Sequence, residues 1–378
     1  MNDIIVLGAG RVGRAIASDL CRDYHITVAD IELHSLSLLK ERYPLEIEEI
    51  DLNDQVELLE LLKPFDLVVS AVPGYMGYQT LETIIEAGKN VADISFFEED
   101  PFELHKKAVQ EKVTAVIDCG VAPGMSNIIL GHHNDQMDVQ QFECMVGGLP
   151  VKRTWPYEYK APFSPIDVIE EYIRPARLVI NGEVVTRPAL SDAEYVNMEP
   201  VGTLEAFHTD GLRTLLKTMD VPNMKEKTLR YPGHVEYMKV LRDTGFFDKK
   251  TREVNGAAIR PIDLTSKLLF NEWKLDPGEP EFTIMEINVE GIQNQQKVTY
   301  AYHLYDEYDH ETDLSSMART TGFTCTSVAR LIFEGKYQNH GINPPEYVGA
   351  DEQCYQQIME DLKDRNVIYQ VEKEIEKT

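Results

Sequence analysis

The 378-residue sequence contains no apolar run of the roughly 18 residues that a membrane-spanning helix needs. Its cysteines show neither a pairing pattern nor the spacing of metal ligands. There are five: Cys21, Cys119, Cys144, Cys325 and Cys354. This usage favours reduced thiols in a cytoplasmic protein without a bound metal. Because the chain starts directly in an apolar strand, we expect no signal peptide.

Positive charge is also scarce. The sequence has 37 Lys and Arg against 64 Asp and Glu, which gives a formal net charge of −27. This charge argues against nucleic acid and anionic membranes as partners. It does not restrict a small substrate, because an acidic surface can coexist with a locally basic pocket. Internal repeats and low-complexity stretches are absent, and the 43% of hydrophobic residues indicates a globular protein with a core.

The most informative segment is an apolar strand, Asp3–Leu7, followed by a glycine-rich turn and a helix over 14–20. The turn consists of Gly8, Ala9, Gly10, Arg11, Val12 and Gly13. In a Gly-x-Gly-x-x-Gly turn, the first glycine permits the tight bend and the second lets the backbone approach a pyrophosphate. The third lets the helix close on the strand. With the N–H groups of the helix N-terminus, the segment predicts a dinucleotide-binding loop.

A second apolar strand, His25–Ala29, ends at Asp30, where an acid is expected to hold the ribose hydroxyls. A carboxylate there repels a 2′-phosphate, and no Arg or Lys occurs in Ile31–His34, so the sequence predicts NAD rather than NADP. Further cofactor-binding candidates follow the third and fourth expected strands. They are Asp51, Ala71, Val72 and Pro73.

The order of elements predicts an α/β fold with a Rossmann-type doubly wound parallel sheet and an inserted α+β domain. We expect a dinucleotide-binding domain over 1–123, a substrate domain with an antiparallel sheet over 124–314, and a C-terminal helical return over 315–378. Segment Gly341–Pro345 is expected to be a loop, and Glu372–Thr378 a charged, frayed tail.

Acidic residues end two neighbouring strands of the expected sheet, Asp93 the fifth and Asp118 the sixth. Ligands of parallel sheets lie beyond the carboxyl ends of the strands, so either carboxylate could transfer a proton or hold an ammonium group. Each could equally cap a turn. The neighbouring Cys119 could be a nucleophile, although a lone cysteine after an apolar strand is more often a small buried hydrophobe.

The second half of the chain offers a different set of candidates. His208 could be a general base near neutral pH or a satisfied core histidine. Arg230, beside a Pro-Gly turn, could anchor a carboxylate through its guanidinium fork, or lie on the surface of a hairpin. The remaining substrate-side candidates are Tyr75, Thr209 and His234.

Taken together, these motifs resemble the saccharopine dehydrogenase-like family, and within it the lysine 6-dehydrogenases. The matching runs are 8–13 with Asp30, 120–127, 146–151, 204–209, 228–234, 317–320 and 341–346. The resemblance implies amino-acid substrates, imine chemistry, and a second domain that covers the nicotinamide and mediates a homodimer. It places Asp118 at an acidic position of the family and Arg230 in a substrate-side motif. The stretch Asp210–Arg213 departs from the lysine enzymes.

The expected function is therefore NAD-dependent oxidative deamination of the terminal amine of L-lysine or a close analogue. Asp93, Asp118 or His208 would take the proton. One alternative is a saccharopine dehydrogenase or reductase, which would need a second carboxylate anchor from Lys152, Arg153, Arg174 or Arg213. A carboxynorspermidine-type condensation and a non-catalytic NAD-binding regulator are the others.

Overall fold

The structure, a computed structural model, describes residues 3–162, 165–276 and 278–376. The chain divides into two compact units, Met1–Gln136 with Ala318–Val367, and Met137–Met317 with Ile368–Thr378. Helix α6 (Met125–Gln136) thus falls in the first unit and strand β18 (Tyr369–Ile375) in the second. The functional domain boundaries that we expect after residues 123 and 314 stay predictions.

The first unit contains a seven-stranded parallel sheet in the order β17-β6-β5-β4-β1-β2-β3. Its strands are β1 (Asp3–Leu7), β2 (His25–Asp30), β3 (Glu46–Glu49), β4 (Leu67–Ser70), β5 (Asn90–Asp93), β6 (Thr114–Val116) and β17 (Gly341–Asn343). The strand order reverses between β1 and β4, which is the switch point where doubly wound sheets bind ligands. The predicted Rossmann-type sheet is confirmed.

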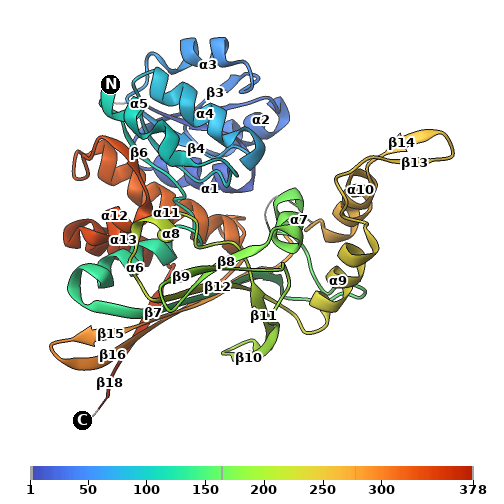
Figure 1. Cartoon of the computed structure of the whole chain (residues 1–378). Helices are drawn as coiled ribbons and strands as arrows, with labels where there is room; N and C mark the ends of the chain where they lie inside the picture. The colour runs from blue at the N-terminus through green and yellow to red at the C-terminus, as the bar shows by residue number, and fades with distance from the viewer. Residues whose placement is uncertain (1–2, 163–164, 277, 377–378) are drawn as a thin grey trace. The chain divides into compact units, whose positions relative to one another are not determined.

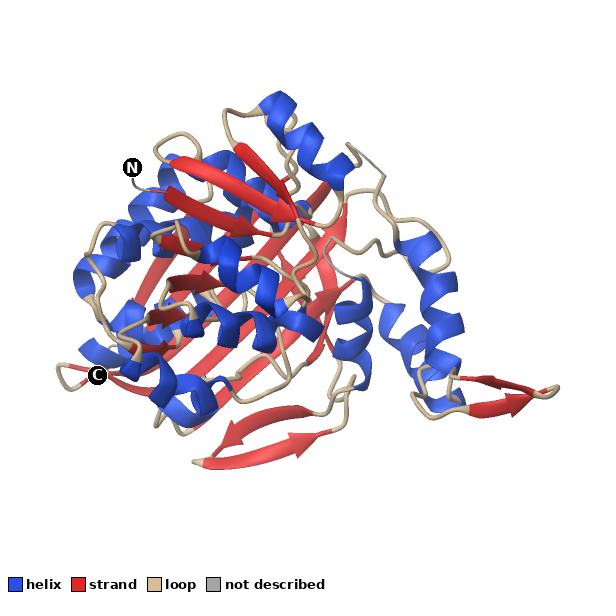
Figure 2. Cartoon of the chain, turned by 90° about the horizontal axis from the view of Figure 1, so that it is seen from above, coloured by secondary structure: helices blue, strands red, loops and turns tan. Residues whose placement is uncertain are grey.

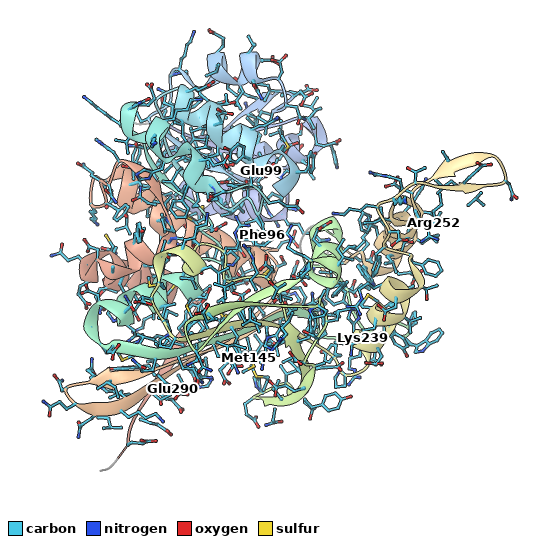
Figure 3. All side chains as sticks on the ribbon, viewed as in Figure 1. Phe96, Glu99, Met145, Lys239, Arg252 and Glu290 are labelled. Carbon is cyan, nitrogen blue, oxygen red and sulfur yellow. The ribbon has the colours of Figure 1, made fainter. Side chains whose placement is uncertain are left out.

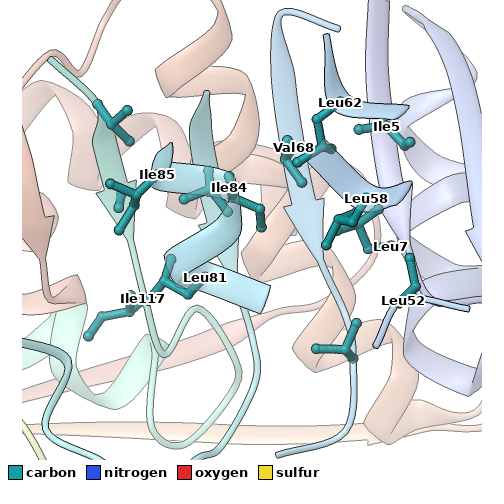
Figure 4. Close-up of a cluster of buried hydrophobic side chains, with 14 of the residues drawn as sticks. Ile5, Leu7, Leu52, Leu58, Leu62, Val68, Leu81, Ile84, Ile85 and Ile117 are labelled. Carbon is teal, nitrogen blue, oxygen red and sulfur yellow. The ribbon is translucent and has the colours of Figure 1, made fainter. Parts of the chain in front are cut away.

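This unit also contains a set of helices, of which Figure 1 labels the α-helices. They are α1 (Arg11–Leu20), α2 (Leu33–Arg42), α3 (Gln55–Leu62), α4 (Gly74–Glu86), η1 (Pro101–Leu104), α5 (His105–Gln110), α6 (Met125–Gln136), α11 (Ser316–Phe333), α12 (Pro345–Ala350) and α13 (Glu352–Asp364). Figure 4 shows apolar side chains of α3 and α4 packed against strands β1 and β4. Leu58 and Ile84, for example, have no exposed surface. This packing fixes where α4 begins after β4.

The expected loop at Gly341–Pro345 is wrong in part. Gly341–Asn343 forms β17, which extends the sheet beyond β6 with Ile342 opposite Ala115. A strand of three residues that begins with a glycine and is followed by two prolines carries no periodic pattern, so only the pairing with β6 reveals it.

A buried ion-pair network ties α1 to the returning helices. Asp19 is fully buried and accepts hydrogen bonds from Arg330 (2.7 Å), Arg365 (2.7 Å) and Thr326 (2.6 Å). Burial alone would raise the pKa of Asp19, but the two guanidinium groups and the hydroxyl lower it overall. Because the folded-state pKa is lowered, the stabilisation is present above the unfolded value of about 3.9 and is lost as the pH falls through the folded value.

We expect Asp19→Asn to reduce the free energy of unfolding by about 3–5 kcal/mol, because two buried cations lose their counter-charge. The measurement is urea unfolding at pH 7. The control is Asp23→Asn, since Asp23 also pairs with Arg330 (2.9 Å) but is half exposed. That change should cost about 0–1 kcal/mol. Equal losses for the two variants would contradict this account of the network.

The second unit is built on a nine-stranded sheet with the path β10-β11-β12-β7-β15-β16-β18, to which β8 and β9 are added beside β12. The strands are β7 (Asp138–Pro150), β8 (Ala176–Ile180), β9 (Glu183–Arg187), β10 (Glu194–Met198), β11 (Gly202–His208), β12 (Asn223–Arg230), β15 (Glu281–Gln293), β16 (Gln296–Glu307) and β18. The expected antiparallel sheet is found at every pair of these strands except one, because β7 and β12 pair in parallel.

The expected frayed tail is also wrong over most of its length. Residues Tyr369–Ile375 form β18, which pairs antiparallel with β16 from Leu304↔Tyr369 to Val298↔Ile375. The charged residues Glu372 and Glu374 are exposed, so their charge is compatible with an edge strand.

The helices of this unit are α7 (Pro165–Ile173), α8 (Leu215–Thr218), α9 (His234–Thr244) and α10 (Pro261–Trp273). Between α9 and α10 lies a two-stranded hairpin, β13 (Arg252–Val254) with β14 (Ala257–Ile259). Figures 1 and 2 show this hairpin extending from the ends of the two helices, and Figure 3 labels Arg252 on it and Lys239 on α9. Helices α7, α9 and α10 cover the core around Trp273.

Candidate active site

The glycine loop after β1 is shaped by close backbone contacts. Gly8 has φ +109°, and a Cβ there would lie 2.6 Å from the carbonyl oxygen of Ala71, which follows β4. A Cβ on Gly13 would lie 2.0 Å from the carbonyl oxygen of Gly8. These two glycines are therefore required by the fold itself, where β1, β4 and α1 meet.

Gly10 is different, because nothing in the described chain requires a glycine there. It has φ −67°, which any residue adopts, and no heavy atom of the described residues beyond its neighbours lies within 4 Å of a Cβ placed on it. It caps α1, whose first turn contains Arg11 and Val12 and whose first N–H groups have no intrahelical acceptor. Open space above a helix N-terminus fits a diphosphate.

Asp30 lies at the end of β2, beside this loop. Its Oδ2 accepts a hydrogen bond from the backbone N–H of Ala9 (2.6 Å), and its Oδ1 accepts one from the N–H of Glu32 (2.9 Å). These bonds hold the carboxylate at the glycine loop with its remaining lone pairs available to a diol. The geometry fits the role that the sequence assigns to Asp30.

We expect Asp30→Ala to lower the preference for NAD over NADP by roughly 10- to 100-fold, since two charge-assisted hydrogen bonds and the repulsion of a 2′-phosphate are lost. Calorimetric titration with both nucleotides measures the ratio. Glu32→Ala removes the same charge two residues away, from an exposed position, and should leave the ratio within about twofold. An unchanged ratio in Asp30→Ala would remove the argument for NAD.

The other cofactor candidates lie at strand ends. The N–H of Ala71 donates to Leu7 (2.8 Å), Val72 is buried, and Pro73 caps α4. Asp51 is exposed after edge strand β3, and its Oδ1 accepts hydrogen bonds from the backbone N–H (3.0 Å) and side chain (2.9 Å) of Asn53. The Oδ1 atom of Asp51 is thus engaged by Asn53 within the turn, and the cofactor role of Asp51 stays a prediction. The substrate candidate Tyr75 is 79% exposed on the first turn of α4.

Asp93 and Asp118 are both buried at the carboxyl edge of the sheet. The Oδ1 of Asp93 accepts hydrogen bonds from the N–H (3.0 Å) and hydroxyl (2.7 Å) of Ser95, whereas its Oδ2 has no partner among the described residues. Burial raises the pKa of Asp93 to about 6, with a smaller contribution from the negative charge of Asp118, although the hydrogen-bonding groups of Ser95 and Ser70 lower it. Asp118 has φ +52°, a backbone conformation that costs a non-glycine residue about 1–3 kcal/mol.

Cys119 is fully buried, and burial raises the pKa of its thiol well above the usual value. A buried thiol of this kind is a poor nucleophile. The structure therefore supports the interpretation of Cys119 as a small core residue.

In the second unit Arg230 is 2% exposed at the end of β12, so the alternative of a surface arginine in a hairpin is wrong. Its guanidinium donates to Glu171 (2.6 Å), the hydroxyl of Tyr172 (3.1 Å) and the carbonyl of Leu229 (2.9 Å). It also stacks over the ring of Tyr159, 4.4 Å from the centroid. These bonds account for three of its five N–H groups and hold the guanidinium rigidly.

His234 belongs to the same network and does not have a free ring nitrogen. Its Nδ1 lies 2.9 Å from the carbonyl oxygen of Tyr157, and its Nε2 lies 2.9 Å from the hydroxyl of Tyr172. Burial, with the charge of Arg230, lowers the pKa of His234 to about 3, so the ring is neutral. His234 thus positions Tyr172 and Arg230.

The pleat of the sheet separates His208 from Arg230. Across β11 and β12, Glu205 lies opposite Arg230 and His208 lies opposite Lys227, three residues away on each strand. Since side chains alternate between faces, His208 and Arg230 are on opposite faces. The Nε2 of His208 lies 3.8 Å from Asp192, and burial, with the charge of Lys227, lowers its pKa.

Thr209 follows His208 and lies on the other side of the strand. Its hydroxyl accepts a hydrogen bond from Thr228 (3.1 Å), which shares a face with Arg230. The structure therefore brings together Arg230, His234 and Thr228 with Thr209, and excludes His208 from that face. The next residue, Asp210, forms a two-pronged pair with Arg177 (2.8 Å for each bond).

Several residues around these groups were missed by sequence reasoning. Ser70 and Ser95 join β4 to Asp93 through hydroxyls 3.4 Å apart. Tyr159 lies against the guanidinium of Arg230, and Trp273 packs on Tyr159; the Tyr159 hydroxyl and the Trp273 Nε1 are buried and have no hydrogen-bond partner among the described residues. Their positions depend on contacts between distant segments. Of these residues, only Ser95 had a signal in the sequence, because it follows Asp93 by two residues.

None of the helices among the described residues is both long and apolar enough to cross a membrane. No group of three or more His, Cys, Asp or Glu in the described part of the chain is arranged to hold a metal ion.

The parallel sheet, glycine loop and strand-end carboxylate of the first unit define the class of proteins with a Rossmann-type dinucleotide-binding domain. Two family models match the sequence, the saccharopine dehydrogenase NADP binding domain over residues 4–116 and the saccharopine dehydrogenase C-terminal domain over residues 120–368. The chain belongs to the saccharopine dehydrogenase family, as its motifs indicated.

The similarity to individual proteins is lower. The chain is 20% identical to bovine alpha-aminoadipic semialdehyde synthase, in an alignment that covers 97% of this chain and 47% of that protein. It is 24% identical to a saccharopine dehydrogenase [NADP(+), L-glutamate-forming] of Schizosaccharomyces pombe, in an alignment that covers 67% of this chain and 60% of that protein. Alignments cover 27–48% of the first curated relatives. Among solved structures, the saccharopine dehydrogenase (L-Glu forming) of Saccharomyces cerevisiae matches with a TM-score of 0.80 at 18% identity, over 99% of this chain and 100% of that one. This last match supports the fold.

Proposed function

We propose that the chain catalyses NAD-dependent oxidative deamination of the terminal amine of L-lysine or a close analogue to the semialdehyde. The observation that carries the nucleotide part is the combination of an open Gly10 with Asp30 held at the same loop. When bound, the oxidised nicotinamide accepts a hydride from the amine-bearing carbon.

The residues of the first unit suit this chemistry. Gly8 and Gly13 shape the loop, the N-terminus of α1 faces the diphosphate, and Asp30 accepts hydrogen bonds from the adenosine ribose. An ammonium group must lose a proton before its carbon can give up a hydride, and the acids at the sheet edge, Asp93 and Asp118, are the proposed acceptors. Water then adds to the substrate imine, which releases ammonia and the semialdehyde.

In the second unit, Arg230 is the proposed anchor for the α-carboxylate. It is rigid, positively charged and accompanied on its face by Thr209 and Thr228. His208 is not proposed as the base, because it lies on the other face of the sheet. Tyr75 stays a predicted substrate contact, and the homodimer and cytoplasmic location also stay predictions.

Saccharopine is the second candidate substrate, favoured by the names of the relatives. It carries two more carboxylates than lysine. Two of the predicted additional anchors are paired with acids of the chain, Arg153 with Glu158 and Arg174 with Glu170 (4.0 Å). Arg230 is likewise paired with Glu171, so these pairs do not separate the two substrates. The saccharopine dehydrogenase of Schizosaccharomyces pombe is named for NADP(+), whereas Asp30 supports NAD in this chain.

The deciding experiment is NADH formation, followed by absorbance, with an amino-acid panel that starts with lysine and saccharopine. We expect lysine to reduce NAD with one ammonia released per NADH. Reduction with saccharopine alone, accompanied by glutamate instead of ammonia, would replace the first candidate with the second. Binding of NAD without turnover of any amine would favour the non-catalytic regulator.

A further inference from the structure

The second unit contains a groove that the proposed reaction does not use. It lies between α7 and α10, which are in contact and are both labelled in Figure 1, and it encloses about 410 Å³. That volume falls within the roughly 300–1,000 Å³ of small-molecule sites. All of the residues that line the groove belong to the second unit, so the nucleotide-binding sheet contributes nothing to it. The groove is therefore a candidate for a separate binding site.

Ser266, which lines the groove from α10, is its most informative residue. It is 7% exposed, and its Oγ is buried without a hydrogen-bond partner among the described residues. A serine or threonine in a helix often donates to the carbonyl four residues earlier, as the neighbouring Thr265 does with Pro261 (2.9 Å). A buried hydroxyl without a partner is unfavourable. An acceptor atom of a ligand in the groove would satisfy it.

The charged side chains of the groove favour an anion. Lys249 pairs with Glu170 (2.8 Å), and Arg260 forms a two-pronged pair with Asp263 (2.6 and 2.8 Å). Lys267 also lines the groove and forms no ion pair within the described part of the chain. The lining thus has one positive charge in excess, on a chain whose formal net charge is −27. One uncompensated ammonium group matches a ligand with one negative charge.

Apolar side chains flank Ser266 along the helix. Ile262 is buried and Phe270 is half-buried, and each lies four residues from Ser266, so the three share one face of α10. Lys267 directly follows Ser266. A carboxylate at Ser266 and Lys267 would therefore place its hydrocarbon chain against Ile262 or Phe270.

We propose that this groove binds a small organic acid with one carboxylate and an apolar chain. The Ser266 hydroxyl donates a hydrogen bond to the carboxylate, and the Lys267 ammonium compensates its charge. The site is distinct from the proposed α-carboxylate anchor, because Arg230 does not line the groove and bonds to Glu171 (2.6 Å). Binding there requires neither a nucleotide nor turnover, so it is independent of the proposed function.

The test is calorimetric titration of the full chain with hexanoate at low ionic strength, compared with hexylamine and inorganic phosphate. Hexylamine has the same chain and the opposite charge at neutral pH, and phosphate lacks the chain. We expect one saturable site for hexanoate and at least about tenfold weaker binding of the other two. Equal affinity for hexanoate and hexylamine, or for hexanoate and phosphate, would overturn the assignment of an organic acid.

Variants locate the site. Ser266→Ala should weaken hexanoate binding by roughly tenfold, because the buried donor is lost. Lys267→Met should weaken it by about two- to fivefold, since an exposed charge is partly screened. The control is Lys250→Met, which removes an exposed lysine that does not line the groove and should leave the affinity within about twofold. An unchanged affinity in Ser266→Ala would overturn the site.

A measurement on the wild type covers the case in which a variant does not fold. In crystals soaked with 6-bromohexanoate, the anomalous signal of bromine should lie between α7 and α10, beside Ile262 or Phe270. The carboxylate should lie within hydrogen-bond distance of the Ser266 Oγ. An empty groove, or a bromine signal only elsewhere on the chain, would overturn the proposed groove site and leave the proposed function standing.

Discussion

Gly10→Val should weaken NAD binding by at least about 100-fold and leave the free energy of unfolding within about 0.5 kcal/mol of the wild type. The reason is that Gly10 has an ordinary φ of −67° and open space around its Cβ direction, so the fold accepts a side chain there. A valine would fill the space through which the diphosphate approaches the N-terminus of α1. Nucleotide titration and urea unfolding on the same sample separate the two effects.

Gly13→Ala is the matched comparison within the same loop. Its Cβ would lie 2.0 Å from the carbonyl oxygen of Gly8, so we expect a lower unfolding free energy together with weaker binding. If Gly10→Val binds NAD normally, or destabilises the protein as much as Gly13→Ala does, the loop is structural and the nucleotide site is elsewhere.

Arg230→Met should lower kcat/KM for lysine by roughly 10- to 100-fold, mainly through KM, and leave NAD affinity unchanged within about twofold. Arg230 is buried and held by Glu171 and Tyr172, so its charge is fixed in place before a carboxylate arrives. Methionine preserves much of the volume between the rings of Tyr159 and Tyr172. Initial rates over a range of lysine concentrations give the two parameters.

A substrate without a carboxylate makes this test specific. With 1,5-diaminopentane the wild type should be slower than with lysine, and Arg230→Met should react with 1,5-diaminopentane as fast as the wild type does. The variant should therefore lose the preference for lysine. Arg177→Met is the control, since Arg177 is half exposed and pairs with Asp210. A parallel loss with both substrates, or a loss of NAD affinity, would assign Arg230 a structural role.

The first unit was largely predictable because each element carries its own signal. The apolar run of β1 and the glycines after it define strand, turn and helix locally, and β1 was predicted at its observed bounds of Asp3–Leu7. Helix α6 was missed, although it starts directly after the Pro-Gly pair at 123–124 and is buried over most of its length. A helix that is buried on nearly all sides lacks the amphipathic period on which prediction relies.

The second unit was less predictable because its arrangement depends on distant partners. The pairing of β7 with β12 in parallel joins segments about eighty residues apart, and no local pattern encodes it. The separation of His208 from Arg230 follows from the register of β11 against β12, since register decides which side chains share a face. Their residue types made both His208 and Arg230 site candidates. Only the alternation of side chains along the paired strands shows that they lie on opposite faces of the sheet.

The most direct test of the central claim is a crystal structure of the chain with NAD. We predict density for the diphosphate against the backbone of 8–13, within hydrogen-bond distance of the N–H groups that begin α1. The adenosine ribose should lie on Asp30. A nucleotide bound away from this loop, or a loop closed by side chains with no space for a diphosphate, would contradict the account.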